Sequence, residues 1–254
     1  ANWPSGEGAT TSDDVLDRYL LAKTHALVAT MTEQLDAYDI AGACQSLRDH
    51  LDVLTNWYIR RSRERFWATA TDEPAVASSR AAFDTLARSL EVLTRLAAPL
   101  LPLVTEDIWQ QLTGGRSVHL TDWPSPDELP ADDALVAAMD AARAVASATL
   151  GLRKAANLRV RLPLPRLTVV TAEPAALQAF SSVIADEVNV REVRLVGLDD
   201  ADGHAVGVDE RLTVNARAAG PRLGRAVQQV IQASKAGDWS RSDDGGVVCG
   251  GVPL

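Results

Sequence analysis

Cysteine is scarce in this chain: among 254 residues only Cys44 and Cys249 occur, far apart and outside any CxxC pair. A zinc site built from four cysteines is therefore excluded, and no disulfide framework is indicated. A reducing compartment fits this cysteine usage, so we expect a cytoplasmic protein. Cys44 falls beside core positions of a predicted helix, and we expect it to be a buried structural thiol.

The sequence also lacks an apolar run long enough to cross a bilayer and a signal-peptide pattern. We therefore expect no membrane partner. The formal net charge of −9 argues at first sight against a nucleic-acid partner. Binding to phosphate depends on where the positive charge lies, however, so the local distribution of arginine decides.

Recognisable catalytic patterns are missing as well. The chain has neither a glycine-rich phosphate loop after a strand nor a GxSxG motif, and its histidines do not have the spacing of metal ligands. No nucleophile or acid–base pair converges, which makes an independent enzyme a weak alternative. We expect no catalytic residue, no metal and no cofactor in this chain. The four histidines are His25, His50, His119 and His204.

Apolar residues at helical spacing dominate the first part of the chain and predict an antiparallel helical bundle. Thr11 and Asp14 match a capping box at the first helix start, and Phe83 belongs to the apolar stripe of the third helix. The later part predicts a small α/β domain. Helices are expected over about 40–67, 79–98, 105–112, 131–156, 174–184 and 221–236, and strands near 167–170, 193–196, 212–214 and 247–249.

These patterns divide the chain into four segments. We expect a linker over 1–12, a helical bundle over 13–130, a connecting helix over 131–156 and a small α/β domain over 157–254. The chain begins without methionine, as a fragment of a longer protein would.

The run WYIRRSRERFW, residues 57–67, is the most informative one. On a helix, Arg61 and Arg65 lie near the apolar stripe, where we expect them either to snorkel or to pair with carboxylates of other helices. A separate outward ridge carries two guanidinium groups, an amide and an aromatic ring, which suit phosphate contact and base stacking. The alternative is a solvated charged face. The ridge residues are Asn56, Arg60, Arg63 and Trp67.

A second basic run, RKAANLRVRLPLPR, contains no acidic residue and is a candidate phosphate-binding strip. The alternative is a junction whose positive charges pair with acidic helices of the bundle. The candidate residues of this strip are Arg153, Lys154, Arg159 and Arg161.

Several runs together resemble the carboxy-terminal, anticodon-binding region of isoleucyl-tRNA synthetases, among them DVLDRYLLAK, LAAPLLPLVTEDIWQQL and LRVRLPLPRLTVV. The resemblance covers nearly the whole chain. Valyl- and leucyl-tRNA synthetases have similar bundles and stay as alternatives, but NWYIRRSRERFW followed by SVHLTDWP resembles the isoleucine enzyme. The later α/β region resembles the carboxy-terminal domain of the eukaryotic-like branch of this family. The other bacterial branch ends in a cysteine-rich zinc module, and this chain, with two cysteines, departs from that pattern.

The resemblance implies recognition of the anticodon stem and loop of a tRNA by the two candidate groups. It implies that Trp109 and Trp123 pack the bundle and its crossing strand. The family's HIGH and KMSKS signatures, which bind ATP, do not occur here. We therefore expect no aminoacylation by this chain alone, with ATP and Mg belonging to a catalytic domain of the same polypeptide, its expected partner. A self-standing RNA-binding module and a helical protein-interaction scaffold stay as alternatives.

Overall fold

The computed structural model describes residues 12–67, 72–198, 212–215, 219, 222–241 and 246–254. The chain forms two compact units, of which the first comprises residues 1–166 and 175–193 and the second residues 167–174 and 194–254. Each unit has its own core. The predicted linker over 1–12 lies almost wholly outside the described residues, and the predicted domain limits stay a prediction.

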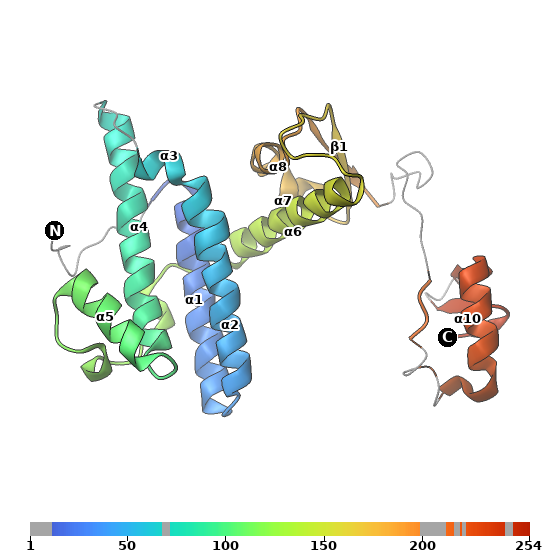
Figure 1. Ribbon diagram of the computed structural model, residues 1–254, viewed down its shortest axis with the longest axis horizontal. Helices are drawn as coiled ribbons and strands as arrows, with labels where there is room; N and C mark the ends of the chain where they lie inside the picture. The colour runs from blue at the N-terminus through green and yellow to red at the C-terminus, as the bar shows by residue number, and fades with distance from the viewer. Residues whose placement is uncertain (1–11, 68–71, 199–211, 216–218, 220–221, 242–245) are drawn as a thin grey trace. The chain divides into compact units, whose positions relative to one another are not determined.

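The first unit is a bundle of helices arranged around α1, against which α2, α4 and α6 pack (Figure 1). Apolar side chains of α1, α2 and α4 form its main core, and their removal from water is the chief stabilising term. Further along the chain, α8 packs on α6. The helices are α1 (Val15–Asp36), α2 (Ile40–Asp52), η1 (Val53–Ile59), α3 (Arg63–Phe66), α4 (Glu73–Ala97), α5 (Pro102–Thr113), η2 (Val118–Leu120), η3 (Pro126–Glu128), α6 (Asp133–Ala155), α7 (Pro174–Gln178) and α8 (Ser181–Val188).

The second unit contains two small sheets. Strands β1 (Leu167–Thr171) and β2 (Val193–Gly197) pair with each other, and β3 (Trp239–Arg241), β4 (Val247–Cys249) and β5 (Val252–Pro253) form an antiparallel sheet in that order. Helix α10 (Val227–Ala236), preceded by η4 (Gly224–Ala226), packs on β4. Its buried Val230 and Ala233 meet Cys249. Gly250 has φ +57°, and a Cβ there would lie 2.7 Å from the Cβ of Ala233, so this turn requires glycine.

The predicted fold class, a helical bundle followed by a small α/β part, is confirmed. The single helix predicted over 40–67 is wrong in detail, because a π-helix, η1, separates α2 from α3. Four side chains of this π-helix are buried. Those side chains are Val53, Leu54, Trp57 and Tyr58.

Other expectations need correction. Cys44 is exposed, because the stripe of α2 that faces the core runs through Ala43 and Leu47 instead. Phe83 is 43% exposed near the middle of α4, outside the main core. The cap of α1 is Asp14, whose side chain accepts from the backbone N–H of Leu16, whereas Thr11 lies outside the described residues. Residues 212–214 form no strand.

A buried carboxylate ties the first unit together at Asp17, which is fully buried in α1. Its oxygens accept hydrogen bonds from Tyr58 Oη at 2.7 Å and from Arg65 Nη1 and Nη2 at 2.8 and 2.7 Å. Arg65 also donates to the carbonyl of Ser78 in α4 at 3.0 Å. Burial and the neighbouring Asp17 raise the pKa of Tyr58, so its hydroxyl stays a donor. Four helical segments therefore meet at one charged pair.

Replacing Asp17 with alanine takes away the closest carboxylate of the largely buried Arg65 guanidinium and leaves it only Asp14, at 3.2 Å. We therefore expect the free energy of unfolding to fall by about 3 kcal/mol, the lower end of the range for breaking a buried pair. Urea unfolding followed by circular dichroism measures the change. Asp36→Ala, at the exposed C-terminal end of the same helix, is the matched control and should change stability by less than about 0.5 kcal/mol. Equal effects of the two substitutions would contradict the role of the buried pair.

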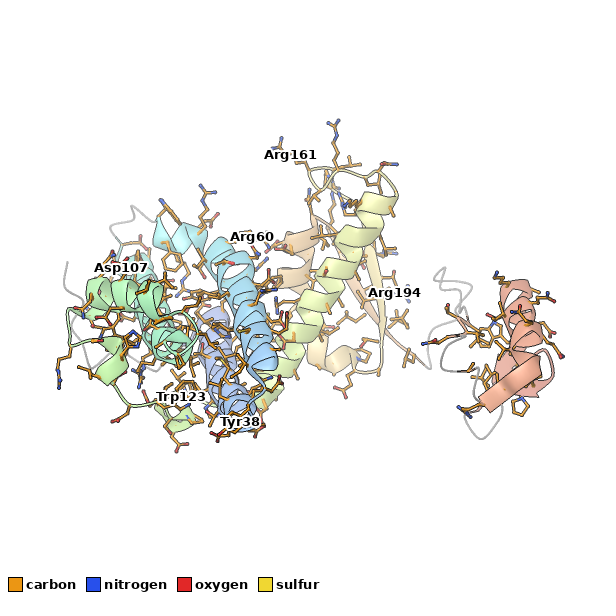
Figure 2. All side chains as sticks on the ribbon, turned by 60° about the horizontal axis from the view of Figure 1, so that its bottom comes forward. Tyr38, Arg60, Asp107, Trp123, Arg161 and Arg194 are labelled. Atoms are coloured by element: carbon orange, nitrogen blue, oxygen red, sulfur yellow. The ribbon has the colours of Figure 1, made fainter. Side chains whose placement is uncertain are left out.

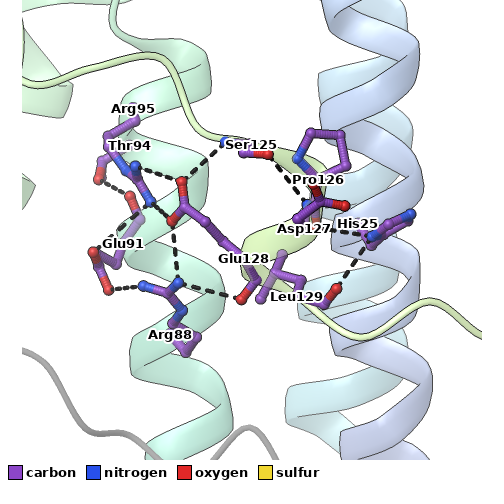
Figure 3. A network of polar contacts seen from close by, with 10 residues as sticks. All are labelled: His25, Arg88, Glu91, Thr94, Arg95, Ser125, Pro126, Asp127, Glu128 and Leu129. Atoms are coloured by element: carbon purple, nitrogen blue, oxygen red, sulfur yellow. Dashed lines mark hydrogen bonds and ion pairs between the residues drawn. The ribbon is translucent and has the colours of Figure 1, made fainter.

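Glu128 anchors the segment that crosses the bundle surface (Figure 3). It closes a capping box with Ser125, and its carboxylate accepts from Arg95 Nη2 at 2.5 Å and from Arg88 Nη2 at 3.1 Å. His25 of α1 holds the same segment through the carbonyl of Pro126 at 2.9 Å. Hydrogen bonding to Arg95 is the main reason that the pKa of Glu128 falls to about 2.

Because the folded-state pKa of Glu128 lies below its ordinary value of 4.5, the ionised carboxylate adds stability above about pH 4.5. This contribution is lost as the pH falls toward 2. We expect Glu128→Gln to lower the free energy of unfolding at pH 6, with the difference from the unmodified chain shrinking between pH 4.5 and 2. Denaturation curves at several pH values measure it. A difference that did not depend on pH would contradict the assignment.

Candidate nucleic-acid interface

The predicted outward ridge is exposed on the bundle. Asn56 lies in η1, Arg60 follows it, Arg63 begins α3 and Trp67 ends it. All four residues are exposed, and Trp67 retains 67% of its accessible surface. The contacts between these residues and tRNA stay a prediction.

The inward half of the same run is paired as expected. Arg65 binds Asp17, and Arg61 donates from Nη1 to Glu187 of α8 at 3.1 Å. The guanidinium of Arg61 also lies 5.2 Å from the ring centroid of buried Trp57. These contacts confirm that Arg61 and Arg65 pair with carboxylates of other helices. Between them Ser62 is buried, whereas Arg63 and Glu64 are exposed.

Arg60 is held in place without being covered. Its Nε donates to the carbonyl of Asn56 at 2.8 Å, and its Nη2 lies 2.5 Å from Glu187. The side chain of Arg60 is 53% exposed, whereas that of Glu187 is 7% exposed. Glu187 carries one negative charge but contacts two guanidinium groups, so the three side chains together keep a net charge of +1. Of the two arginines, Arg60 is the one exposed to solvent.

Arg63 and Trp67 form a second exposed pair. The Arg63 guanidinium lies 5.6 Å from the centre of the Trp67 ring, within range of a cation–π contact. The Trp67 ring meets Phe66 edge-on at 6.4 Å, and Phe66 meets Phe83 at 5.0 Å. Arg63 has no ion pair with any residue that the structure describes. An exposed aromatic ring beside an unneutralised guanidinium is suited to stacking a base next to a phosphate.

The second predicted strip divides in two. Lys154, Arg159 and Arg161 are exposed and have no ion pair within the described part of the chain. Arg153 is only 3% exposed, so its assignment to a phosphate-binding surface is corrected. Its guanidinium instead donates to backbone carbonyls of the following loop, because the last turn of α6 points this side chain under the loop.

The end of α8 connects the two exposed groups. Glu187 binds Arg60 and Arg61, and two residues later Asn189 donates from Nδ2 to the carbonyl of Val160 at 2.9 Å. Arg60 and Arg161 are labelled in Figure 2, on the α2 side and on the loop after α6. The run DEVNV therefore contributes two positioning residues that the sequence analysis assigned no role. The only sign of this role in the sequence is that Glu187 and Asn189 are polar residues beside the apolar stripe of a predicted helix.

Helix α6 corrects one expectation, because by length and composition it could cross a membrane, with 22% of its most apolar stretch buried. Its Asp140, however, binds Lys23 of α1 at 2.5 Å and Tyr19 at 2.6 Å, and α6 also packs on α8. This packing is that of a bundle helix.

Trp109 is buried, as expected, with Nε1 donating to the Arg116 carbonyl. The described residues contain no group of three or more histidines, cysteines or acids able to hold a metal.

Comparison with known proteins agrees with this architecture. The family model described as the anticodon-binding domain of tRNA ligase matches residues 17–170, which include η1, α3, α6 and the loop after α6. The chain therefore belongs to the anticodon-binding domain family of tRNA ligases.

Within that family, the similar relatives carry a more specific name. An isoleucine–tRNA ligase of Leifsonia xyli subsp. xyli is 60% identical over 246 residues, which cover 97% of this chain and 21% of the relative. Isoleucine–tRNA ligases of Nocardia farcinica and of Mycobacterium tuberculosis strain H37Rv are 54% and 53% identical over 249 residues, 98% of this chain and 23% of each relative. The chain thus spans about a fifth of the length of these curated relatives.

Glu187→Gln removes the charge that holds Arg60 and Arg61 while keeping the shape of the side chain. We expect the free energy of unfolding to fall by about 1.5–3 kcal/mol, the range for hydrogen bonds to charged groups. Thermal and urea unfolding measure this loss. Glu64→Gln, at an exposed position of α3 with no ion pair to a described residue, is the control and should be nearly neutral. A neutral Glu187→Gln would contradict the account.

Proposed function

We propose that this chain is the tRNA-recognition part of an isoleucine–tRNA ligase and that it contacts the anticodon stem and loop. The observation that carries the proposal is the exposed ridge of Asn56, Arg60, Arg63 and Trp67 within an anticodon-binding domain. Similarity to ligases named for isoleucine supports the choice among tRNA ligases.

The ridge offers two kinds of contact. Arg60 and Arg63 suit the phosphate oxygens of the stem, because guanidinium groups pair with them bidentately. The exposed Trp67 ring suits an unstacked base of the loop, which double-stranded RNA does not offer. Phosphate contacts would set the register, and base contacts would supply the selectivity.

The chain's net charge of −9 limits the strength of this contact. Long-range repulsion of the tRNA opposes the local arginines, so we expect weak binding by the chain alone. In a longer ligase, linked domains would add contacts at high effective concentration. Binding of ATP and Mg and the transfer of isoleucine are proposed for those domains, since the HIGH and KMSKS signatures do not occur in this chain.

The rest of such a ligase is also the proposed partner of an apolar face on α5. Leu103 is 86% exposed and Val104 and Ile108 lie on the same helix with 48% and 38% exposure. The alternative, a helical protein-interaction scaffold, would instead use the Ala/Leu-rich faces of the helices predicted over 79–98 and 131–156, and it would show no salt-dependent RNA binding. We also propose a cytoplasmic location and no membrane partner. Membership of the eukaryotic-like branch is proposed from the resemblance of the later α/β region to that branch.

The test is a titration of the chain with isoleucine tRNA and a non-cognate tRNA at several salt concentrations. We expect salt-sensitive binding that favours isoleucine tRNA. The double variant Arg60→Ala/Arg63→Ala should weaken binding and lower the slope of log K against log salt by about 1 for each arginine removed.

The matched control is Arg48→Ala/Arg116→Ala, which removes two exposed arginines without ion pairs to described residues elsewhere on the bundle. It removes the same charge and should leave the slope nearly unchanged. If the two double variants weakened binding equally, the ridge would not be the tRNA site. If the chain bound no tRNA at low salt, the scaffold alternative would be favoured.

A further inference from the structure

Residues 157–162, here called the Arg153 loop, have no regular secondary structure but are tied at several points. The backbone N–H of Leu158 donates to the Arg153 carbonyl at 2.8 Å, and that of Leu162 donates to the Arg159 carbonyl at 3.0 Å. Asn157 has φ +56°, which turns the chain sharply at the end of α6. The loop is thus a defined turn structure.

Arg153 supports this loop from below. Its Nη2 lies 2.6, 3.2 and 2.5 Å from the carbonyl oxygens of Arg159, Val160 and Leu162. The Val160 carbonyl also accepts from Asn189, so two side chains fix the same peptide. Since these carbonyls turn inward to the guanidinium, their peptides are held in one orientation.

Burial of Arg153 is costly, which argues against a packing role alone. No carboxylate among the described residues pairs with it, and its Nε and Nη1 lack a hydrogen-bond acceptor. A buried, uncompensated cation destabilises a fold, and an apolar residue would fill the space more favourably. The same charge, however, raises the positive potential of the loop above it.

The outer surface of the Arg153 loop is cationic. Arg159 and Arg161 are exposed, as is Lys154 one turn before, and none pairs with a described carboxylate. The surface has no aromatic ring that would stack a base. Its chemistry therefore fits backbone phosphates of RNA, which are spaced along a strand, more closely than it fits bases.

We infer that Arg153 is a positioning residue that shapes the Arg153 loop into a preformed phosphate-binding surface for the RNA backbone. This inference rests on the proposed tRNA-binding function. A loop already held in its binding shape avoids the loss of conformational entropy that ordering it on the RNA would cost. Phosphate contacts carry no sequence information, so the loop contributes affinity and salt dependence to any tRNA equally.

A double-mutant cycle on the whole chain tests this, with cognate and non-cognate tRNA as ligands. We expect Arg159→Ala/Arg161→Ala to weaken both complexes by the same factor and to lower the salt slope by about 2. Arg153→Met should weaken both complexes as well. Combined with the two loop substitutions, Arg153→Met should weaken binding by a much smaller factor than it does in the unmodified chain, because most of the groups that it positions are already removed.

One further variant and the ridge variant Arg60→Ala/Arg63→Ala show which of the two proposals fails. Asn189→Gly removes the second donor to the Val160 carbonyl at a position with φ +52°, where glycine is tolerated, and replaces Arg153→Met if that variant does not fold. Additive effects, or RNA binding unaffected by every loop variant while Arg60→Ala/Arg63→Ala weakens it, would overturn this inference alone. Absence of binding by the unmodified chain would overturn the proposed function with it.

Discussion

The buried pair of Asp17 and Arg65 fixes the geometry on which the candidate interface depends. It joins α1 to α3, while Tyr58 and Ser78 bring η1 and α4 to the same point. Because Arg65 is turned inward at this point, the neighbouring Arg63 is left on the outer side of the short helix α3. The core therefore sets the direction of the exposed cations. A short helix of four residues has little stability of its own, and this pair supplies the constraint.

A second constraint operates at the end of α8. Glu187 and Asn189 hold the Arg60 region and the loop after α6, which are about one hundred residues apart in sequence. One buried carboxylate serving two arginines leaves a local excess of positive charge in a chain whose net charge is −9. Local arrangement, and not total charge, thus makes phosphate binding physically reasonable for this protein.

Helical periodicity was sufficient to predict the bundle and the inward pairing of Arg61 and Arg65, because both follow from angular position on a helix. The role of Arg153 could not be predicted in this way. Its acceptors are backbone carbonyls of a loop, and every residue type has such a carbonyl. Nothing in the sequence therefore separates the buried Arg153 from the exposed cations of the same basic run. The π-helical turn of η1 was missed for a related reason: its apolar spacing also fits an ordinary helix. Sequence resemblance, not periodicity, indicated the family.

Site-specific photo-crosslinking tests the central claim most directly, namely that the outer side of α3 faces tRNA. A photoreactive amino acid in place of Arg63 should crosslink isoleucine tRNA within its anticodon stem and loop. The same group in place of Arg116, an exposed position elsewhere on the bundle, should give little product. Crosslinks of equal yield from both positions, or crosslinks from position 63 to the acceptor stem, would contradict the account.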